Sequence, residues 1–167
     1  MTHMDPVVIA SGYVPGAIGR VAEMHGVYYA REWGFGRFFE AQVATGIAAF
    51  LDRLDPARDG FWTASVGGRI EGSIGIDGLR AADEGAHLRW FIVGDGLRGR
   101  GIGERLVTGA LDFCRAAGHP KVFLWTFAGL DPARRLYERH GFRLTEERRG
   151  SMWGTEVTEQ RFELLLG

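Results

Sequence analysis

The stretch from residue 86 to residue 117 constrains this chain most, because it reads as a strand, a glycine-rich turn and a helix in direct succession. Leu88, Trp90, Phe91, Ile92 and Val93 form a short apolar run rich in aromatic and β-branched side chains, which is typical of a strand buried on both faces. From Ile102 onward the apolar residues recur at helical spacing. Between the two lie five glycines, Gly94, Gly96, Gly99, Gly101 and Gly103. Free amides at a helix start, with Arg98 and Arg100 beside them, predict a binding site for a phosphate or pyrophosphate.

Two phosphate-binding patterns overlap in this turn. Residues 94–99 match G-x-G-x-x-G, the fingerprint of dinucleotide-binding folds. Residues 98–103 read Arg-Gly-Arg-Gly-Ile-Gly, which matches R-x-x-G-x-G, the pyrophosphate loop of acyl-CoA transferases. Glycine makes up 26 of the 167 residues, so chance matches are common and the flanking sequence has to decide.

Composition and charge narrow the class of protein. The chain is long enough to bury one sizeable core, so we expect a single domain over residues 1–167. A net charge of -1 gives no basic field that would attract nucleic acid or an anionic membrane. Without a leader-like start or an apolar run of about 18 residues, we expect a cytoplasmic protein with no membrane partner. The single cysteine, Cys114, is expected to be a buried, inert thiol, and no residue cluster has metal-ligand spacing.

The remaining periodicities predict an α/β chain. Strands are expected at residues 7–10, 61–66, 69–76, 86–93, 121–126, 142–147 and 155–166, and helices at about 15–31, 38–54, 101–117 and 131–140. Gly67-Gly68 predicts a two-residue hairpin turn. Pro15 is expected in the first turn of the first helix, and Asp131 as the cap of the last. Three successive strands ahead of the glycine turn argue against a doubly wound nucleotide-binding fold.

The sequence after the glycine turn separates the two patterns. A dinucleotide site needs an acidic residue at the end of the next strand, and residues 121–126, Lys-Val-Phe-Leu-Trp-Thr, end without one. Residues 133–142, Ala-Arg-Arg-Leu-Tyr-Glu-Arg-His-Gly-Phe, instead form an A-x-x-L-Y-E-x-x-G-F element. With residues 98–103, this element resembles the GNAT superfamily of acyl-CoA-dependent N-acetyltransferases. The resemblance covers about residues 61–166 and is weaker over the first 50.

The resemblance implies a fold and a cosubstrate. The fold would be α/β, with a mixed, mostly antiparallel central sheet of about six to seven strands flanked by about four helices. The cosubstrate would be acetyl-CoA, with its pantetheine arm along the main chain of Phe91, Ile92 and Val93 and Ala133 among the cofactor contacts. Its pyrophosphate would lie on the loop of Arg98, Gly99, Arg100, Gly101, Ile102 and Gly103.

Two further features qualify the resemblance. Many members have asparagine where this chain has Leu130, and Asp131 is either a substitute for that contact or a helix cap. Residues 25–29 and Glu32 are similar to the acetyltransferase half of bacterial proteins that fuse a MarR-type regulator to a GNAT domain. No regulator segment is found in this sequence.

The resemblance also implies catalytic roles. Tyr137 occupies the position of the general acid that protonates the departing thiolate. His87 lies near the start of the central strand, where several relatives place a catalytic carboxylate, and is the candidate base. Other candidate bases are His25, Glu32 and Glu84. The aromatic residues Trp33, Phe35 and Phe38 are candidates either for the acceptor pocket or for core packing.

The predicted activity is transfer of an acetyl group from acetyl-CoA directly to a primary amine of a small molecule or peptide, in a ternary complex. The alternative is a non-catalytic acyl-CoA-binding module, either a sensor or the partner of a regulator. Tyr137 favours the enzyme, and the lack of an obvious base favours the module. The resemblance is compatible with a homodimer, but no sequence feature fixes the oligomeric state.

Overall fold

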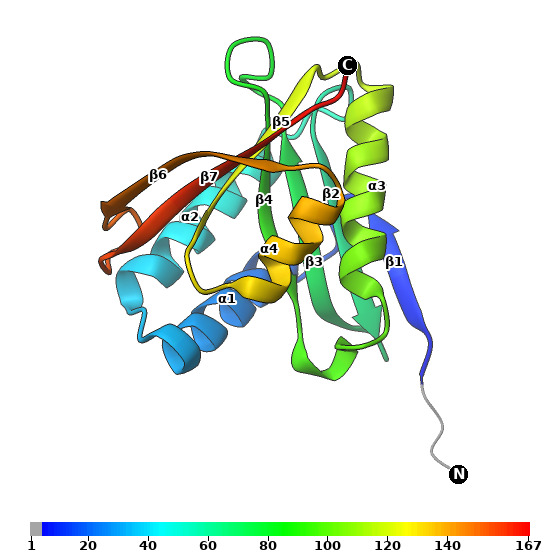
Figure 1. The fold of residues 1–167 in the computed structure, drawn as a ribbon. Helices are drawn as coiled ribbons and strands as arrows, with labels where there is room; N and C mark the ends of the chain where they lie inside the picture. Colours follow the sequence, from blue (N-terminus) through cyan, green and yellow to red (C-terminus); the bar gives the residue numbers. More distant parts are fainter. Residues whose placement is uncertain (1–4) are drawn as a thin grey trace.

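The computed structural model describes residues 5–167, and a seven-stranded sheet runs through that span (Figure 1). Its strands are β1 (Val7–Ser11), β2 (Gly60–Val66), β3 (Arg69–Asp77), β4 (Ala86–Val93), β5 (Lys121–Phe127), β6 (Arg143–Gly150) and β7 (Val157–Leu165). The helices are α1 (Ala17–Trp33), α2 (Arg37–Asp52), α3 (Ile102–Ala116) and α4 (Asp131–Arg139), with a single 3-10 turn at Asp95–Leu97. Every predicted strand and helix is present, with bounds that differ by a few residues.

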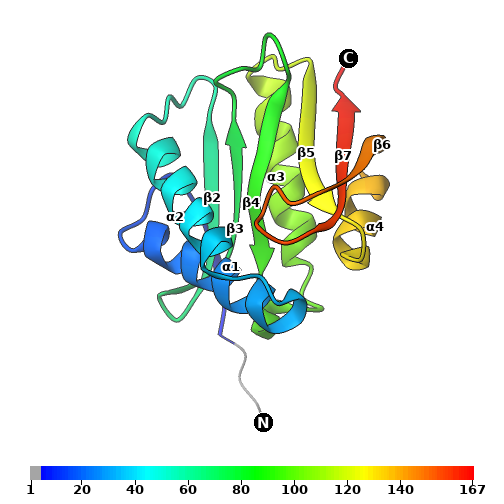
Figure 2. The same cartoon turned by 90° about the vertical axis from the view of Figure 1, so that its left-hand side faces the viewer.

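The strand order is β1-β2-β3-β4-β5-β7-β6, and every neighbouring pair is antiparallel except β4 and β5. Helices α1 and α2 cover one face of the sheet, and α3 and α4 lie on the other (Figures 1 and 2). This is the mixed, mostly antiparallel sheet with four helices that the sequence predicts. The meander that precedes the glycine turn is β1 through β4, formed by antiparallel neighbours.

The sheet has an apolar core on each face. On the α3 face, Leu88, Leu106, Leu124 and Phe162 pack together and are almost fully buried. Cys114 belongs to this core, and its burial raises the pKa of the thiol to about 12, in agreement with a buried, inert cysteine. On the other face, buried side chains from α1, α2 and the sheet pack together, among them Val21, Ile47, Phe50, Phe61 and Trp90. The two cores fix both helix layers against the strands between them.

Glycine geometry explains one confirmed turn and one shifted boundary. Gly67 and Gly68 have φ of 57° and 80°, as a two-residue hairpin turn of this kind requires. The first helix begins at Ala17, so the predicted place of Pro15 in its first turn is wrong. Gly16 takes a left-handed φ of 91° directly before the helix, and Pro15 therefore lies in the preceding turn.

The start of α4 also differs from the prediction. Leu130 holds the cap position and Asp131 is already the first helical residue, so the expectation that Asp131 caps the helix is wrong. No side chain caps this helix end by a hydrogen bond. The Asp131 carboxylate lies in the first turn instead, where a negative charge interacts favourably with the helix dipole.

Candidate active site

Strands β4 and β5 pair with each other only at the first residues of β4. Their register pairs Ala86 with Val122 and His87 with Phe123, and in the described part of the chain no later pair joins them. The strands diverge beyond that point (Figure 2). A cavity of about 1240 Å³ opens there, lined by parts of α1, α2, β4, β5, α4, the β4–α3 turn and the β6–β7 loop. The unpaired edge of β4 forms part of this cavity.

An irregularity in β4 decides which side chains face the two sides of the sheet. Trp90 has a φ of 52°, the sole positive φ of a non-glycine residue in the described chain, and the β3–β4 register shifts between Ser73 and Gly75. The Ser73 hydroxyl donates a 2.6 Å hydrogen bond to the Trp90 carbonyl. Trp90 packs into the α1/α2 core, whereas Phe91 and Val93 pack against the α3 core. The bulge therefore reverses the alternation of the strand.

The glycine turn leads into α3 at one end of this cavity. Gly99 and Gly101 have φ of 76° and 72°, and Gly101 is the residue just before the helix. The first amides of α3 have no hydrogen-bond partner within the helix. Because glycine has no side chain, nothing at these positions screens the amides from a ligand. A Cβ on Gly103 would lie 3.4 Å from Phe91 Cζ and 3.5 Å from Leu136 Cδ2, so β4, α3 and α4 pack closely there. Free amides at the positive end of a helix dipole fit a pyrophosphate.

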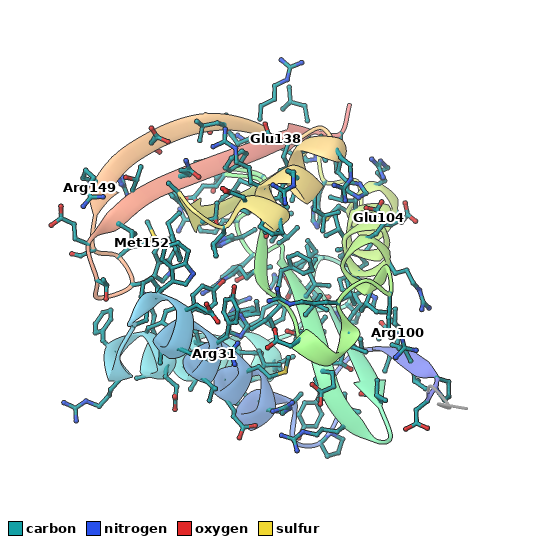
Figure 3. All side chains as sticks on the ribbon, turned by 60° about the horizontal axis from the view of Figure 1, so that its bottom comes forward. Arg31, Arg100, Glu104, Glu138, Arg149 and Met152 are labelled. Carbon is teal, nitrogen blue, oxygen red and sulfur yellow. The ribbon has the colours of Figure 1, made fainter. Side chains whose placement is uncertain are left out.

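The two arginines of the turn point to different places. Arg98 lines the cavity and pairs with Asp95 at 3.1 Å. Arg100 donates a 3.0 Å hydrogen bond to the carbonyl of Asp5 and lies beside β1, away from Arg31 at the cavity (Figure 3). Of the residues predicted to contact the cofactor, Arg100 alone is not part of the cavity wall.

Tyr137 lies deep in the cavity wall, on α4. Its ring is 6.0 Å from that of Phe91, 5.8 Å from Phe142 and 6.5 Å from Phe162. Burial raises the pKa of the Tyr137 phenol well above its usual value, and the neighbouring phenol of Tyr29 raises it further. Tyr137 is therefore protonated throughout the neutral range, as a proton donor has to be.

His87 lies where β4 and β5 begin to diverge. Its ring stacks on Phe123, with 4.4 Å between centroids and 17° between planes. Burial lowers the pKa of His87 to about 3, and the positive charge of Arg89 adds to this effect. The imidazole is neutral at pH 7, so it can accept a proton, but the site does little to stabilise the imidazolium that would form.

The other candidate bases divide between the cavity and the outside. His25 and Glu32 line the cavity, whereas Glu84 does not and pairs with Arg80 at 3.5 Å. The Nδ1–H of His25 donates a 2.8 Å hydrogen bond to the Val21 carbonyl. Burial lowers the pKa of His25 to about 4, so this ring is also neutral at pH 7.

The three aromatic candidates for the acceptor pocket have different positions. Trp33 lines the cavity, and its ring lies 4.9 Å from Phe127. Phe35 is buried in the core beside Tyr29, and Phe38 is 60% exposed. Leu130 and Ala133 both line the cavity, so an apolar side chain occupies the position where relatives have asparagine.

At the opposite end of the cavity, sequence reasoning identified His87 and missed the other residues. We call this end the acceptor chamber; its walls come from α2, β4, β5 and the β6–β7 loop, through Gln42, His87, Arg89, Trp125, Met152 and Trp153. The Gln42 side-chain amide donates a 3.1 Å hydrogen bond to the Met152 carbonyl, which ties the loop to α2 (Figure 3). The sequence did carry a signal for Arg89, because a charged residue within an otherwise apolar strand, two positions after His87, is unusual and indicates a site. Nothing local indicates Met152 or Trp153.

Two features are absent from the described residues 5–167. No helix there is both long and apolar enough to cross a membrane. No group of three or more His, Cys, Asp or Glu side chains there is placed to hold a metal ion. The absence of a metal requirement stays a prediction.

Comparison with known proteins gives the same family that the sequence motifs resemble. The profile of the Acetyltransferase (GNAT) family matches residues 25–142. The probable N-acetyltransferase camello of Xenopus laevis is 34% identical over 83 residues, which are 50% of this chain and 38% of that protein. Mycothiol acetyltransferase of Corynebacterium aurimucosum is 41% identical over 69 residues, 40% of this chain and 23% of that one. The matched segments thus span well under half of these relatives.

Solved structures extend the likeness to the fold of almost the whole chain. A GNAT-family acetyltransferase from Staphylococcus aureus has a TM-score of 0.77 and 19% identity, covering 97% of this chain and 100% of its own. The yncA protein of Salmonella typhimurium, solved with acetyl-CoA, has a TM-score of 0.75 and 14% identity, covering 97% and 95%. The predicted GNAT fold is confirmed, and the profile match includes both Arg98–Gly103 and Tyr137. The chain belongs to the GNAT family of acetyltransferases.

Proposed function

We propose that this protein transfers the acetyl group of acetyl-CoA directly to a primary amine of a small molecule or peptide, in a ternary complex. One observation carries the proposal: a single cavity contains both the glycine turn at the start of α3 and the buried phenol of Tyr137. The first fits the phosphates of CoA, and the second fits a proton donor for a leaving thiolate. The family assignment supports the same reaction class.

The cofactor end would hold acetyl-CoA through main-chain groups. Beyond His87, β4 has no β5 partner in the described chain, so its edge near Phe91, Ile92 and Val93 can pair with the amides of a pantetheine arm as with an added strand. The pyrophosphate would lie on the amides of residues 98–103, with Arg98 nearby and Ala133 on the opposite wall. Arg100 would contribute its backbone only, since its guanidinium is bound to Asp5.

Bound acetyl-CoA supplies an acyl thioester, whose C–S bond breaks as the amine nitrogen forms the new amide bond. Tyr137 would donate its phenolic proton toward the departing sulfur and later recover one from solvent. His87 would accept the proton that the nitrogen loses. Because the pKa of His87 is lowered to about 3, we propose that it relays this proton to water rather than retaining it.

A non-catalytic acyl-CoA-binding module is the second candidate. The observation that favours it is the same low pKa of His87, which makes the imidazole a weak base. The enzyme and the module share the cofactor end and differ only in whether an amine reacts. Such a module, whether it is a sensor or the partner of a regulator, would bind acetyl-CoA but would not convert it to free CoA.

Two measurements test the function. Acetyl-CoA or CoA at about 100 times its Kd should stabilise the fold by about 2.7 kcal/mol and raise the Tm, whereas NAD should not. Thiol release from acetyl-CoA should then accelerate on addition of a reactive primary amine. Stabilisation by NAD but not by CoA contradicts both readings, and stabilisation by CoA without amine-dependent thiol release favours the module.

A further inference from the structure

Arg89 places a positive charge in the acceptor chamber. It lies on β4 two positions after His87 and just before the bulge, on the face covered by α1 and α2. Its guanidinium stacks over the Trp90 ring at 4.2 Å. Helix α2 approaches closely, because a Cβ on Gly46 would lie 3.2 Å from Arg89 Nη2. The stack and the helix hold the guanidinium in one place at the chamber wall.

The carboxylate nearest to Arg89 is already engaged by another arginine. Arg53 binds Asp77 with both of its terminal nitrogens, at 3.2 Å to Oδ1 and 2.7 Å to Oδ2. Asp77 also accepts a 3.2 Å hydrogen bond from the Leu79 amide. Arg89 reaches the same carboxylate through Nη1 alone, at 3.5 Å. Its charge is therefore compensated less well than that of Arg53, although burial makes it costly to leave a charge unpaired.

The carboxylates that line the cavity are engaged as well. Glu23 and Glu71 pair with Arg20, Glu32 with Arg31, Asp95 with Arg98, and Glu104 with Arg139 and His140. The other chamber walls are an amide, a thioether and indole rings, from Gln42, Met152, Trp125 and Trp153. A polycationic acceptor would meet no free carboxylate among these described side chains. An apolar molecule with one anionic group would match both the walls and the charge.

We infer that the acceptor is an amine that also carries a carboxylate, such as an amino acid with an apolar side chain, and that Arg89 binds the carboxylate. The inference rests on the proposed acetyl transfer. A guanidinium presents paired N–H groups that match a carboxylate in a two-hydrogen-bond contact. His87 and Arg89 are alternate residues of one strand and so about 7 Å apart on one face. A carboxylate on Arg89 leaves an amine on the neighbouring carbon directed toward His87 and the diverging strands.

The test compares acceptors that differ only in the carboxylate. L-phenylalanine and L-phenylalaninamide form one pair, and L-methionine and L-methioninamide a second, with kcat/KM measured by CoA thiol release. We expect the wild type to prefer the carboxylate member. Arg89→Gln should lower kcat/KM for that member by about 10- to 100-fold and change the amide by less than about threefold. Arg89→Lys should recover part of the loss, because it keeps the charge but not the paired geometry.

Arg161→Gln is the matched control. Arg161 also lies over an aromatic ring, Phe123 at 4.0 Å, on a neighbouring part of the sheet, but it does not line the cavity. This variant should keep the wild-type preference. All variants should retain the thermal shift with acetyl-CoA, since Arg89 is remote from the glycine turn.

Two results would overturn the inference. One is a wild-type kcat/KM that is equal for the carboxylate and the amide member of a pair. The other is an equal loss of kcat/KM on both members in Arg89→Gln. Where turnover is too slow to measure, calorimetry with CoA present compares N-acetyl-L-phenylalanine with N-acetyl-L-phenylalaninamide. Equal binding of the two, or binding of neither, also overturns it. Loss of the acetyl-CoA thermal shift in the wild type would contradict the proposed function itself, which separates the two failures.

Discussion

His87 and Phe123 form the last register pair between β4 and β5, and their rings stack at 4.4 Å within 17° of parallel. The stack fixes the imidazole at the point where the two strands begin to diverge. It also buries the ring, which is the main cause of its lowered pKa. His87 thus ends the pairing of β4 with β5 and is also the residue proposed to accept the proton of the amine.

Replacing His87 tests its part in proton transfer. His87→Gln should lower kcat by about 100-fold, the lower limit for loss of a positioned acid or base, while acetyl-CoA still raises the Tm. Because the pKa of His87 is lowered to about 3, kcat/KM in the wild type should show no enzyme ionisation near pH 6.5. Unchanged turnover in His87→Gln, or a clear inflection at 6.5 that the variant abolishes, would contradict this role.

Tyr137→Phe removes the proposed acid and keeps the ring. We expect kcat to fall about 100-fold with acetyl-CoA affinity nearly unchanged, because the ring still packs against Phe91 and Phe142. Tyr13→Phe is the control, since Tyr13 is 58% exposed and lies outside the cavity wall. Steady-state kinetics and calorimetry with acetyl-CoA provide the two readouts. Normal turnover in Tyr137→Phe would exclude the phenol from the reaction.

Two glycine substitutions distinguish the two phosphate-binding patterns. Gly101→Ala places a side chain at a φ of 72°, a strain of about 1–2 kcal/mol, and should weaken acetyl-CoA binding about tenfold as the turn shifts. Gly96→Ala meets no atom within 4 Å at an ordinary φ and should leave binding unchanged. Calorimetric Kd values for acetyl-CoA measure both. Weaker binding in Gly96→Ala alone would favour the pattern at residues 94–99.

The buried His25 predicts loss of stability in acid. Its pKa is about 4 in the folded protein and about 6.5 in the unfolded chain, so between these values only the unfolded chain binds the proton. The free energy of unfolding should therefore fall by about 2 kcal/mol from pH 7 to pH 5 through this residue. Urea unfolding of the wild type and His25→Gln at the two pH values measures the difference. An equal pH dependence in both proteins would show that His25 does not contribute.

Local sequence pattern predicted that the glycine turn precedes α3 and that Tyr137 lies on α4, but it gave no information where the fold brings distant segments together. The glycine turn and Tyr137 lie within short motifs, so their place on α3 and α4 follows from helix signals. Strict alternation would direct His87, Arg89 and Phe91 to one face, but the bulge at Trp90 sends Phe91 to the other. A bulge depends on pairing with β3, which a single strand does not encode. Met152 was missed because its position depends on the contact between the β6–β7 loop and α2.

The residues proposed to hold the acyl donor fall between Phe91 and Tyr137, in one unbroken piece of chain. The proposed acceptor chamber takes Gln42 from α2 in the first third of the sequence and Met152 and Trp153 from its last tenth. Part of the proposed acceptor chamber is therefore encoded far from the donor segment, while Arg89 lies just before it. Substitutions in α2 and in the β6–β7 loop can therefore reshape the far walls of the chamber without altering the segment proposed to bind the acyl donor.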